Sequence, residues 1–191
     1  MKIILGSQSK GRRGVLERAG YEFEVMVADI DEKAIRRDDP RKLTLALAHA
    51  KADALAQKIH ESALLVTSDQ IVVWNGEIRE KPEGPEQARE FLSGYAEHPA
   101  ETVTAVVVTN VKTGKRREGV DVARVYFRPV PHDVIERFVA SGDPFTHAGG
   151  FSIENRLLQP YIARIEGGED SVIGLPLALL ERLMQEVSEN E

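Results

Sequence analysis

Two long valine-rich runs, joined by a short turn, constrain the fold of this chain most strongly. ETVTAVVVTN (Glu101–Asn110) and GVDVARVYFRPV (Gly119–Val130) have the composition of strands, and the Lys-Thr-Gly between them is typical of an antiparallel hairpin. The other strand and helix patterns alternate along the chain, as they do around parallel sheets. Because the hairpin adds antiparallel strands to this alternating pattern of strands and helices, we predict an α/β fold with a mixed sheet and flanking helices, not a simple doubly wound order.

The remaining elements follow from apolar periodicity and from turn and capping residues. We predict strands over Lys2–Leu5, YEFEVMV (Tyr21–Val27), Ala63–Trp74 with a short return strand after an Asn-Gly turn, and PYIARIEGG (Pro160–Gly168). We predict helices from about Lys10 to Ala19 with Ser9 as the cap, Arg41 to His60, Pro85 to Tyr95, His132 to Gly142, and from about Pro176 onward.

Composition narrows the class of protein. The 191 residues predict one domain (1–191), or one domain with two lobes. There is no cysteine, no apolar N-terminal core of a signal peptide, and no run approaching the ~20 apolar residues of a membrane span, so we expect a cytoplasmic protein that does not contact membranes. A net charge of -6 argues against broad nucleic-acid binding, although a few cations in one place can still bind a small phosphorylated ligand.

The segment GSQSKGRR (Gly6–Arg13) follows the first predicted strand. Gly6 and Gly11 have the spacing of the two glycines of a P-loop, but Arg12 and Arg13 stand where that loop requires Lys and then Ser or Thr. What remains is a turn with two hydroxyls and a helix N-terminus with two guanidinium groups, which suits a phosphate. The plainer alternative is a solvated basic first turn.

The segment TSDQ (Thr67–Gln70) interrupts an otherwise apolar strand. Asp69 is a poor strand former there, and a buried carboxylate without a partner is unfavourable. Such a violation of local rules is expected at a functional site. The alternative is a bulge, or a break between two shorter strands, with Asp69 in solvent.

Three further features could bind charge. Lys51 interrupts an apolar row on its predicted helix, so it either extends to solvent or meets an anion. Lys81 precedes Pro82, which would stiffen the backbone, although most such lysines are only solvated. ADIDE, with Asp31 and Glu32, could bind a hard cation or could be a plain acidic loop.

Taken in order, these pieces resemble the Maf family of nucleoside triphosphate pyrophosphatases over nearly the whole chain. The corresponding segments are LGSQSKGRR, the Asp31-Glu32 pair, the helical Lys51, SDQ, GEIREKP, AGGFSIE and VIGLP. The resemblance implies an elongated α/β body with a mixed sheet and two lobes around a central cleft, as in the related inosine triphosphate pyrophosphatases. It also implies that the protein often forms a homodimer.

The resemblance further implies an enzyme that hydrolyses a nucleoside triphosphate to the monophosphate and pyrophosphate with a divalent cation, Mg²⁺ or Mn²⁺. Asp69 matches the catalytic carboxylate and Glu32 the second acid, so these two are the expected metal ligands. The expected phosphate-binding residues are Ser7, Arg12, Lys51 and Lys81.

Three positions that face the base in this family are Gly11, Gln70 and Glu154. The dTTP/UTP branch typically has Arg, Thr and Gln there, whereas the 7-methyl-GTP branch has Ser-Asp-Gln and a Glu, which this chain matches at Gln70 and Glu154. That branch has a bulky residue in place of Gly11, so the match is partial. A carboxylate can accept both the N1–H and the N2 amino group of guanine, and it attracts a cationic 7-methylated purine.

We therefore expect a house-cleaning pyrophosphatase that acts on a modified purine triphosphate, 7-methyl-GTP first. Two alternatives stay open: a nucleotide-binding regulator of septum formation without significant turnover, and a pyrophosphatase of the dTTP/UTP type. A regulator would need the phosphate-binding cations but would have no use for Asp69 within a strand.

Overall fold

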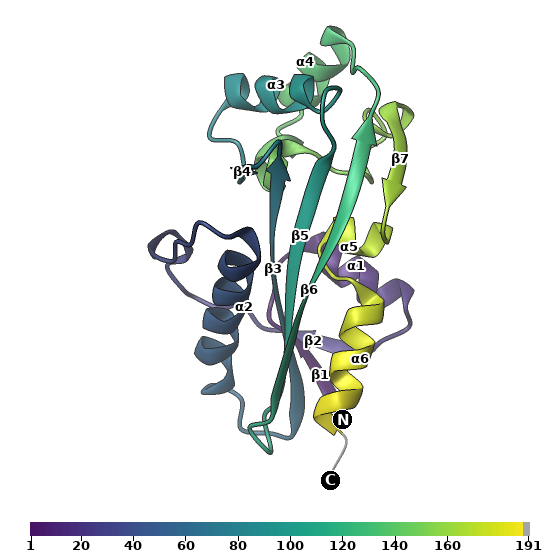
Figure 1. Cartoon of the computed structure of the whole chain (residues 1–191). Helices are drawn as coiled ribbons and strands as arrows, with labels where there is room; N and C mark the ends of the chain where they lie inside the picture. The colour runs from purple at the N-terminus through teal and green to yellow at the C-terminus, as the bar shows by residue number, and fades with distance from the viewer. Residues whose placement is uncertain (189–191) are drawn as a thin grey trace. The chain divides into compact units, whose positions relative to one another are not determined.

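The computed structural model describes residues 1–188 and contains one mixed sheet with helices around it (Figure 1). The order of hydrogen-bonded strands is β2-β1-β3-β5-β6-β7, with β4 paired to β3. The strands are β1 (Lys2–Leu5), β2 (Phe23–Val25), β3 (Ala63–Trp74), β4 (Glu77–Arg79), β5 (Ala100–Asn110), β6 (Arg116–Phe127) and β7 (Ile162–Glu166). The α-helices are α1 (Lys10–Arg18), α2 (Pro40–Ala56), α3 (Pro85–Gly94), α4 (His132–Ala140), α5 (Glu169–Ile173) and α6 (Leu177–Ser188).

The expected mixed α/β sheet is confirmed. Strand β1 is parallel to both β2 and β3, whereas β3 is antiparallel to β4 and β6 is antiparallel to β7. None of the described helices is both long enough and apolar enough to cross a membrane.

The chain divides into two compact units. Unit 1 comprises residues 1–69, 104–121 and the described residues from 173 onward, and unit 2 comprises residues 70–103 and 122–172. Strands β3, β5 and β6 each contribute residues to both units.

The core of unit 1 follows from the alternation of side chains along its strands. Ile3 and Leu5 of β1 point to one face of the sheet, where they join a cluster that includes residues of α1 and α6. Ile4 points to the other face, where a second cluster contains alanines and leucines of α2. Figure 1 shows α2 on one side of these strands and α1 and α6 on the other. Both faces are therefore covered, as a parallel segment requires.

Unit 2 contains a buried aromatic cluster. The ring centroids of Tyr95, Phe127 and Phe151 lie 5.3–5.6 Å apart, with Phe151 meeting the other two edge to face. Beside this cluster, β3 returns as β4 through Asn75 and Gly76, which both have positive φ (48° and 84°). This is the backbone that a two-residue hairpin turn needs, so the predicted Asn-Gly turn is confirmed.

Some element boundaries differ from the predictions. The strand expected over residues 21–27 pairs only at Phe23–Val25, because β1, its partner, ends at Leu5 opposite Val25. The helix expected to reach His60 ends at Ala56, and the short helix α5 was not predicted. The HAGGFSIEN segment contains a short 3-10 turn at Ala148–Gly150.

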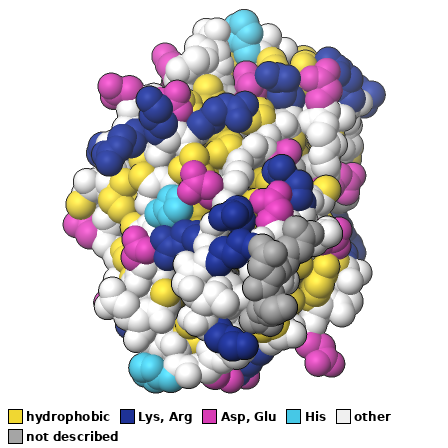
Figure 2. All heavy atoms as spheres, turned by 60° about the horizontal axis from the view of Figure 1, so that its bottom comes forward, with side chains coloured by type: hydrophobic (Ala, Val, Ile, Leu, Met, Phe, Trp, Pro, Cys, Tyr) yellow, Lys and Arg dark blue, Asp and Glu magenta, His cyan; other side chains and the backbone are white. Residues whose placement is uncertain are grey.

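Charged side chains on the surface are mixed in sign. On the face turned forward in Figure 2, Lys and Arg side chains lie among Asp and Glu side chains and hydrophobic ones. Ion pairs in unit 1 show the same mixing: Arg116 lies 2.7 Å from Asp53, and His49 contacts Glu118.

Candidate functional site

The turn after β1 is shaped by its small residues. The amide of Gly6 donates to the carbonyl of Val66 on β3 (2.7 Å), and a Cβ at Gly6 would lie only 2.6 Å from the Thr67 side chain. Ser9 caps α1, as predicted, by accepting from the amide of Arg12 at 3.4 Å. The turn therefore brings the start of α1 close against β3.

Arg12 projects from the first turn of α1 into a set of oxygen acceptors. Its Nε donates to the carbonyl of Gly174 (2.9 Å), and one terminal nitrogen donates to the carbonyl of Ser68 (2.9 Å) and to Ser7 Oγ (3.2 Å). Burial lowers the pKa of Arg12, and the nearby carboxylates of Asp69 and Glu32 oppose this. The interpretation of this segment as a solvated basic turn is therefore wrong for Arg12.

Asp69 lies within an unbroken strand. Strand β3 runs continuously from Ala63 to Trp74, and Asp69 is only 7% exposed. The alternative of a strand break with Asp69 in solvent is therefore wrong. The two preceding hydroxyls hold the strand to its neighbours: Thr67 donates to the carbonyl of Ala48 on α2, and Ser68 donates to the carbonyl of Gly174.

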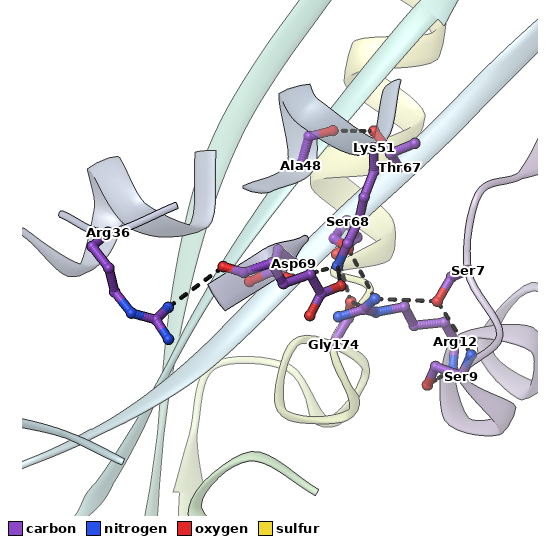
Figure 3. Close-up of polar contacts among 11 residues, drawn as sticks. Ser7, Ser9, Arg12, Arg36, Ala48, Lys51, Thr67, Ser68, Asp69 and Gly174 are labelled. Atoms are coloured by element: carbon purple, nitrogen blue, oxygen red, sulfur yellow. Dashed lines mark hydrogen bonds and ion pairs between the residues drawn. The ribbon is translucent and has the colours of Figure 1, made fainter. Parts of the chain in front are cut away.

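Lys51 does not extend to solvent. Its side chain is 12% exposed, and its Nζ lies 2.6 Å from Asp69 Oδ1 and 2.9 Å from Glu32 Oε1. Figure 3 shows Lys51 and Arg12 approaching Asp69 from different elements. Of the two interpretations of Lys51 from the sequence, contact with an anionic group is confirmed.

Burial raises the pKa of Asp69, while Lys51 and Arg12 oppose the rise and Glu32 adds to it. We attribute the net direction to desolvation, because Asp69 lies inside the strand while Glu32 is 56% exposed and so adds little. The site therefore holds a carboxylate whose charged form is less favourable than it would be in water.

The two neighbouring carboxylates Asp31 and Glu32 make different contacts. Asp31 caps a short 3-10 turn, Glu32–Ala34, by accepting from the amides of Lys33 and Ala34. Glu32 instead contacts Lys51, which brings it to the same ammonium group as Asp69. Only Glu32 of this pair therefore joins the site.

The pair Glu32 and Asp69 suits a hard divalent cation. Among residues 1–188 no group of three or more His, Cys, Asp and Glu side chains is arranged to bind a metal. Mg²⁺ is, however, commonly held by one or two carboxylates together with the phosphates of its substrate. Two carboxylates that share one ammonium group fit this donor set.

The remaining predicted site residues lie in unit 2, except Gly11. Lys81 follows β4 and is exposed, and Glu154 is exposed. The amide nitrogen of Gln70 donates to the carbonyls of Ser171 (2.8 Å) and Val172 (3.1 Å). In unit 1, a Cβ at Gly11 would lie 2.8 Å from Ile173 Cγ2, so Ile173 occupies the space beside this glycine.

Sequence reasoning missed the role of Gly174. Its carbonyl accepts from both Arg12 and Ser68, and its φ of 108° is one that other residues rarely adopt. The signal was present in the VIGLP motif, but a motif does not show which backbone carbonyl it presents. The structure thus adds Ser68 and Gly174 as residues that orient Arg12.

Comparisons with known proteins identify the family of this chain. A family model described as "Maf-like protein" matches residues 2–187. A 7-methyl-GTP pyrophosphatase of Dictyostelium discoideum is 43% identical over 98% of each chain. A nucleoside triphosphate pyrophosphatase of Synechococcus sp. is 37% identical over 97% of this chain and 93% of its own, and a dTTP/UTP pyrophosphatase of Alkaliphilus metalliredigens is 32% identical over 96% and 94%.

Proposed function

The chain belongs to the Maf family, and from that premise we propose that it hydrolyses a nucleoside triphosphate to the monophosphate and pyrophosphate. The observation that carries the proposal is the contact of a buried strand carboxylate, Asp69, with Lys51, together with the position of Arg12 beside it. The activity belongs to the hydrolases of acid anhydrides, and we place it in the cytoplasm, where a modified nucleotide would be removed.

Positive charge at the site would make the α-phosphorus accessible to water. A triphosphate carries several negative charges that repel a nucleophile, and positioned cations offset them most as charge develops in the transition state. Lys51 has three N–H donors, two of which suffice for Asp69 and Glu32, so a third can turn to a phosphate oxygen. Arg12 and Ser7 supply further donors in the same unit, and we assign Lys81 of unit 2 to the phosphates as well.

Asp69 is the group that activates or orients the attacking water. Burial raises the pKa of Asp69, which makes it a stronger base than an ordinary aspartate. Orienting the attacking water without taking its proton is the second role open to the same oxygen atoms, and both roles require Asp69 to be ionised. The cation, Mg²⁺ or Mn²⁺, would be held by Glu32 and Asp69, and when bound it offsets phosphate charge and lowers the pKa of water.

Base selectivity rests on Glu154 and Gln70, and we propose 7-methyl-GTP as the preferred substrate. A carboxylate accepts both donors of the guanine edge, whereas uracil and thymine offer one ring N–H between two acceptors. The higher identity to the Dictyostelium 7-methyl-GTP pyrophosphatase (43%) than to the Alkaliphilus dTTP/UTP pyrophosphatase (32%) supports this choice.

The test is a panel of triphosphates that includes 7-methyl-GTP, GTP, dTTP and UTP, incubated with Mg²⁺ and separately with excess chelator. We expect monophosphate and pyrophosphate in equal amounts, fastest from 7-methyl-GTP, and no turnover with chelator. The control variant is Asp53→Asn, which removes an exposed carboxylate of α2 that contacts Arg116. Faster hydrolysis of dTTP than of every purine would overturn the substrate assignment, and binding without turnover would favour a nucleotide-binding regulator.

A further inference from the structure

Arg79 is a buried arginine that the proposed chemistry does not use. The residue is 3% exposed, and in the described part of the chain no carboxylate pairs with it. A guanidinium group without a carboxylate partner is costly to bury unless other groups compensate for its charge. Its position therefore calls for a physical reason.

Three aromatic rings of unit 2 surround this guanidinium. The carbon Cζ of Arg79 lies 3.8 Å from the ring centroid of Trp74, 4.5 Å from that of Phe91 and 5.2 Å from that of Tyr95. One of its terminal nitrogens also donates to the carbonyl of Phe91 at 3.1 Å. Cation–π contacts of this kind strengthen when they are desolvated, and a planar guanidinium stacks where an ammonium cannot.

The local sequence explains how Arg79 comes to lie within this enclosure of Trp74, Phe91 and Tyr95. In the β3–β4 hairpin Trp74 is opposite Glu77 and Arg79 is opposite Val72, so Trp74 and Arg79 share a face as diagonal neighbours. Gly94 makes room for both, because a Cβ there would lie 2.9 Å from Trp74 Cζ2 and 3.4 Å from a terminal nitrogen of Arg79. The carbonyl of Gly94 also accepts from Trp74 Nε1 at 3.0 Å.

The same enclosure holds the segment that carries Lys81. The hydroxyl of Tyr95 donates to the carbonyl of Gly149 (2.7 Å), and the amide of Gly149 donates to the carbonyl of Glu80 (3.0 Å). Burial raises the pKa of Tyr95 and so keeps the hydroxyl protonated as a donor. A Cβ on Gly150 would lie 2.9 Å from Pro82 Cγ, so this glycine allows the close contact with Pro82.

The backbone on both sides of Lys81 is thus held in place by contacts of Glu80 and Pro82. Arg79 and Pro82 are buried on either side of it, whereas Glu80 and Lys81 are exposed. We infer that Arg79, enclosed by Trp74, Phe91 and Tyr95, is a positioning residue that fixes the backbone from which Lys81 reaches the substrate phosphates. The inference deepens the proposed function and rests on it for the role of Lys81.

The kinetic test is a double-mutant cycle between Arg79→Met and Lys81→Ala, assayed with the triphosphate that the wild type hydrolyses fastest. Misplacing a group by about 1 Å can cost about a hundredfold in rate, so we expect Arg79→Met to lower kcat/KM by about ten- to a hundredfold. In the Lys81→Ala background the same change should have little effect, because the group it positions is already gone. An equal loss in both backgrounds would overturn the inference.

A second measurement does not need turnover. Hydrogen exchange of the Gly149 amide, which donates to Glu80, should become about tenfold faster in Arg79→Met and in the milder Tyr95→Phe. Unchanged exchange in both variants would overturn the inference even if no triphosphate were hydrolysed, so its failure is distinguishable from failure of the proposed function. Arg89→Met is the matched control, because Arg89 pairs with Glu136 on α4 and should leave both readouts unchanged.

Discussion

The ammonium group of Lys51 lies 2.6 Å from Asp69 and 2.9 Å from Glu32, so one cation joins two carboxylates that come from different parts of unit 1. Lys51 is on α2, Asp69 is within β3, and Glu32 begins a short 3-10 turn before α2. Burial raises the pKa of Asp69 in spite of this contact.

Asp69→Asn should stabilise the fold while removing turnover. Replacing the buried carboxylate removes a charge whose desolvation outweighs its ion pairs, and Lys51 keeps Glu32 as a partner. We expect the Tm, measured without metal or nucleotide, to rise by a few degrees, since about 1 kcal/mol corresponds to about 2–4 °C for a chain of this size. The rate should fall by about 10²–10⁴-fold.

The stabilisation by Asp69→Asn should increase with pH. The pKa of Asp69 is higher in the folded than in the unfolded state, so the folded protein binds more protons between the two values. The Tm difference between Asp69→Asn and the wild type should vanish below the unfolded pKa and grow as the pH rises through the folded pKa. A difference that grows toward acid pH would contradict the raised pKa.

Lys51→Met should lower both activity and stability. The variant leaves Asp69 without its nearest cation and removes one phosphate ligand, so we expect kcat/KM to fall by about a hundredfold. Lys42→Met, on an exposed position of the same helix, is the control and should behave as the wild type. Equal behaviour of the two variants in kinetics and in thermal unfolding would contradict the role of Lys51 at the site.

The effect of Gly11→Ala on the free energy of unfolding should depend on the residue at position 173. A Cβ at Gly11 would lie 2.8 Å from Ile173 Cγ2, and overpacking of this kind costs about 1–3 kcal/mol. Alanine in a helix gains about 1 kcal/mol over glycine, so the substitution should stabilise an Ile173→Ala protein and destabilise the wild type. Chemical denaturation of the four proteins measures this, and the same sign in both backgrounds would contradict the contact.

Glu154→Gln should reduce the preference for guanine bases. Hydrogen bonds to a charged group contribute about 1.5–3 kcal/mol, so the ratio of kcat/KM for 7-methyl-GTP to that for dTTP should fall by about ten- to a hundredfold. Glu97→Gln, an exposed position of the same unit, is the control. An unchanged ratio would mean that Glu154 does not contact the base.

The sequence predicted the parts of this protein that depend on local chemistry. The Asn75-Gly76 turn and the Ser9 cap depend on residues within a few positions of each other, and both are confirmed. Asp69 was found because it violates the apolar pattern of its own strand. In each case the signal lies within one element.

Long-range geometry could not be predicted in the same way. Arg12 and Gly174 are 162 positions apart, and their hydrogen bond depends on how α1 and the segment before α6 pack on β3. The ring stack on Arg79 likewise combines β3, β4 and α3, while the sequence shows only a basic residue in a polar motif. Periodicity identifies such elements but does not specify which atoms meet.

The central claim, that water attacks the α-phosphorus at the site formed by Asp69, Lys51 and Arg12, has a direct test. 7-Methyl-GTP is hydrolysed in ¹⁸O-labelled water with Mg²⁺, and the products are analysed by mass spectrometry for the wild type and for Asp69→Asn. We expect 7-methyl-GMP carrying one ¹⁸O and unlabelled pyrophosphate, with neither formed at a comparable rate by the variant. Label in pyrophosphate, release of inorganic phosphate with 7-methyl-GDP, or full activity of Asp69→Asn would contradict it.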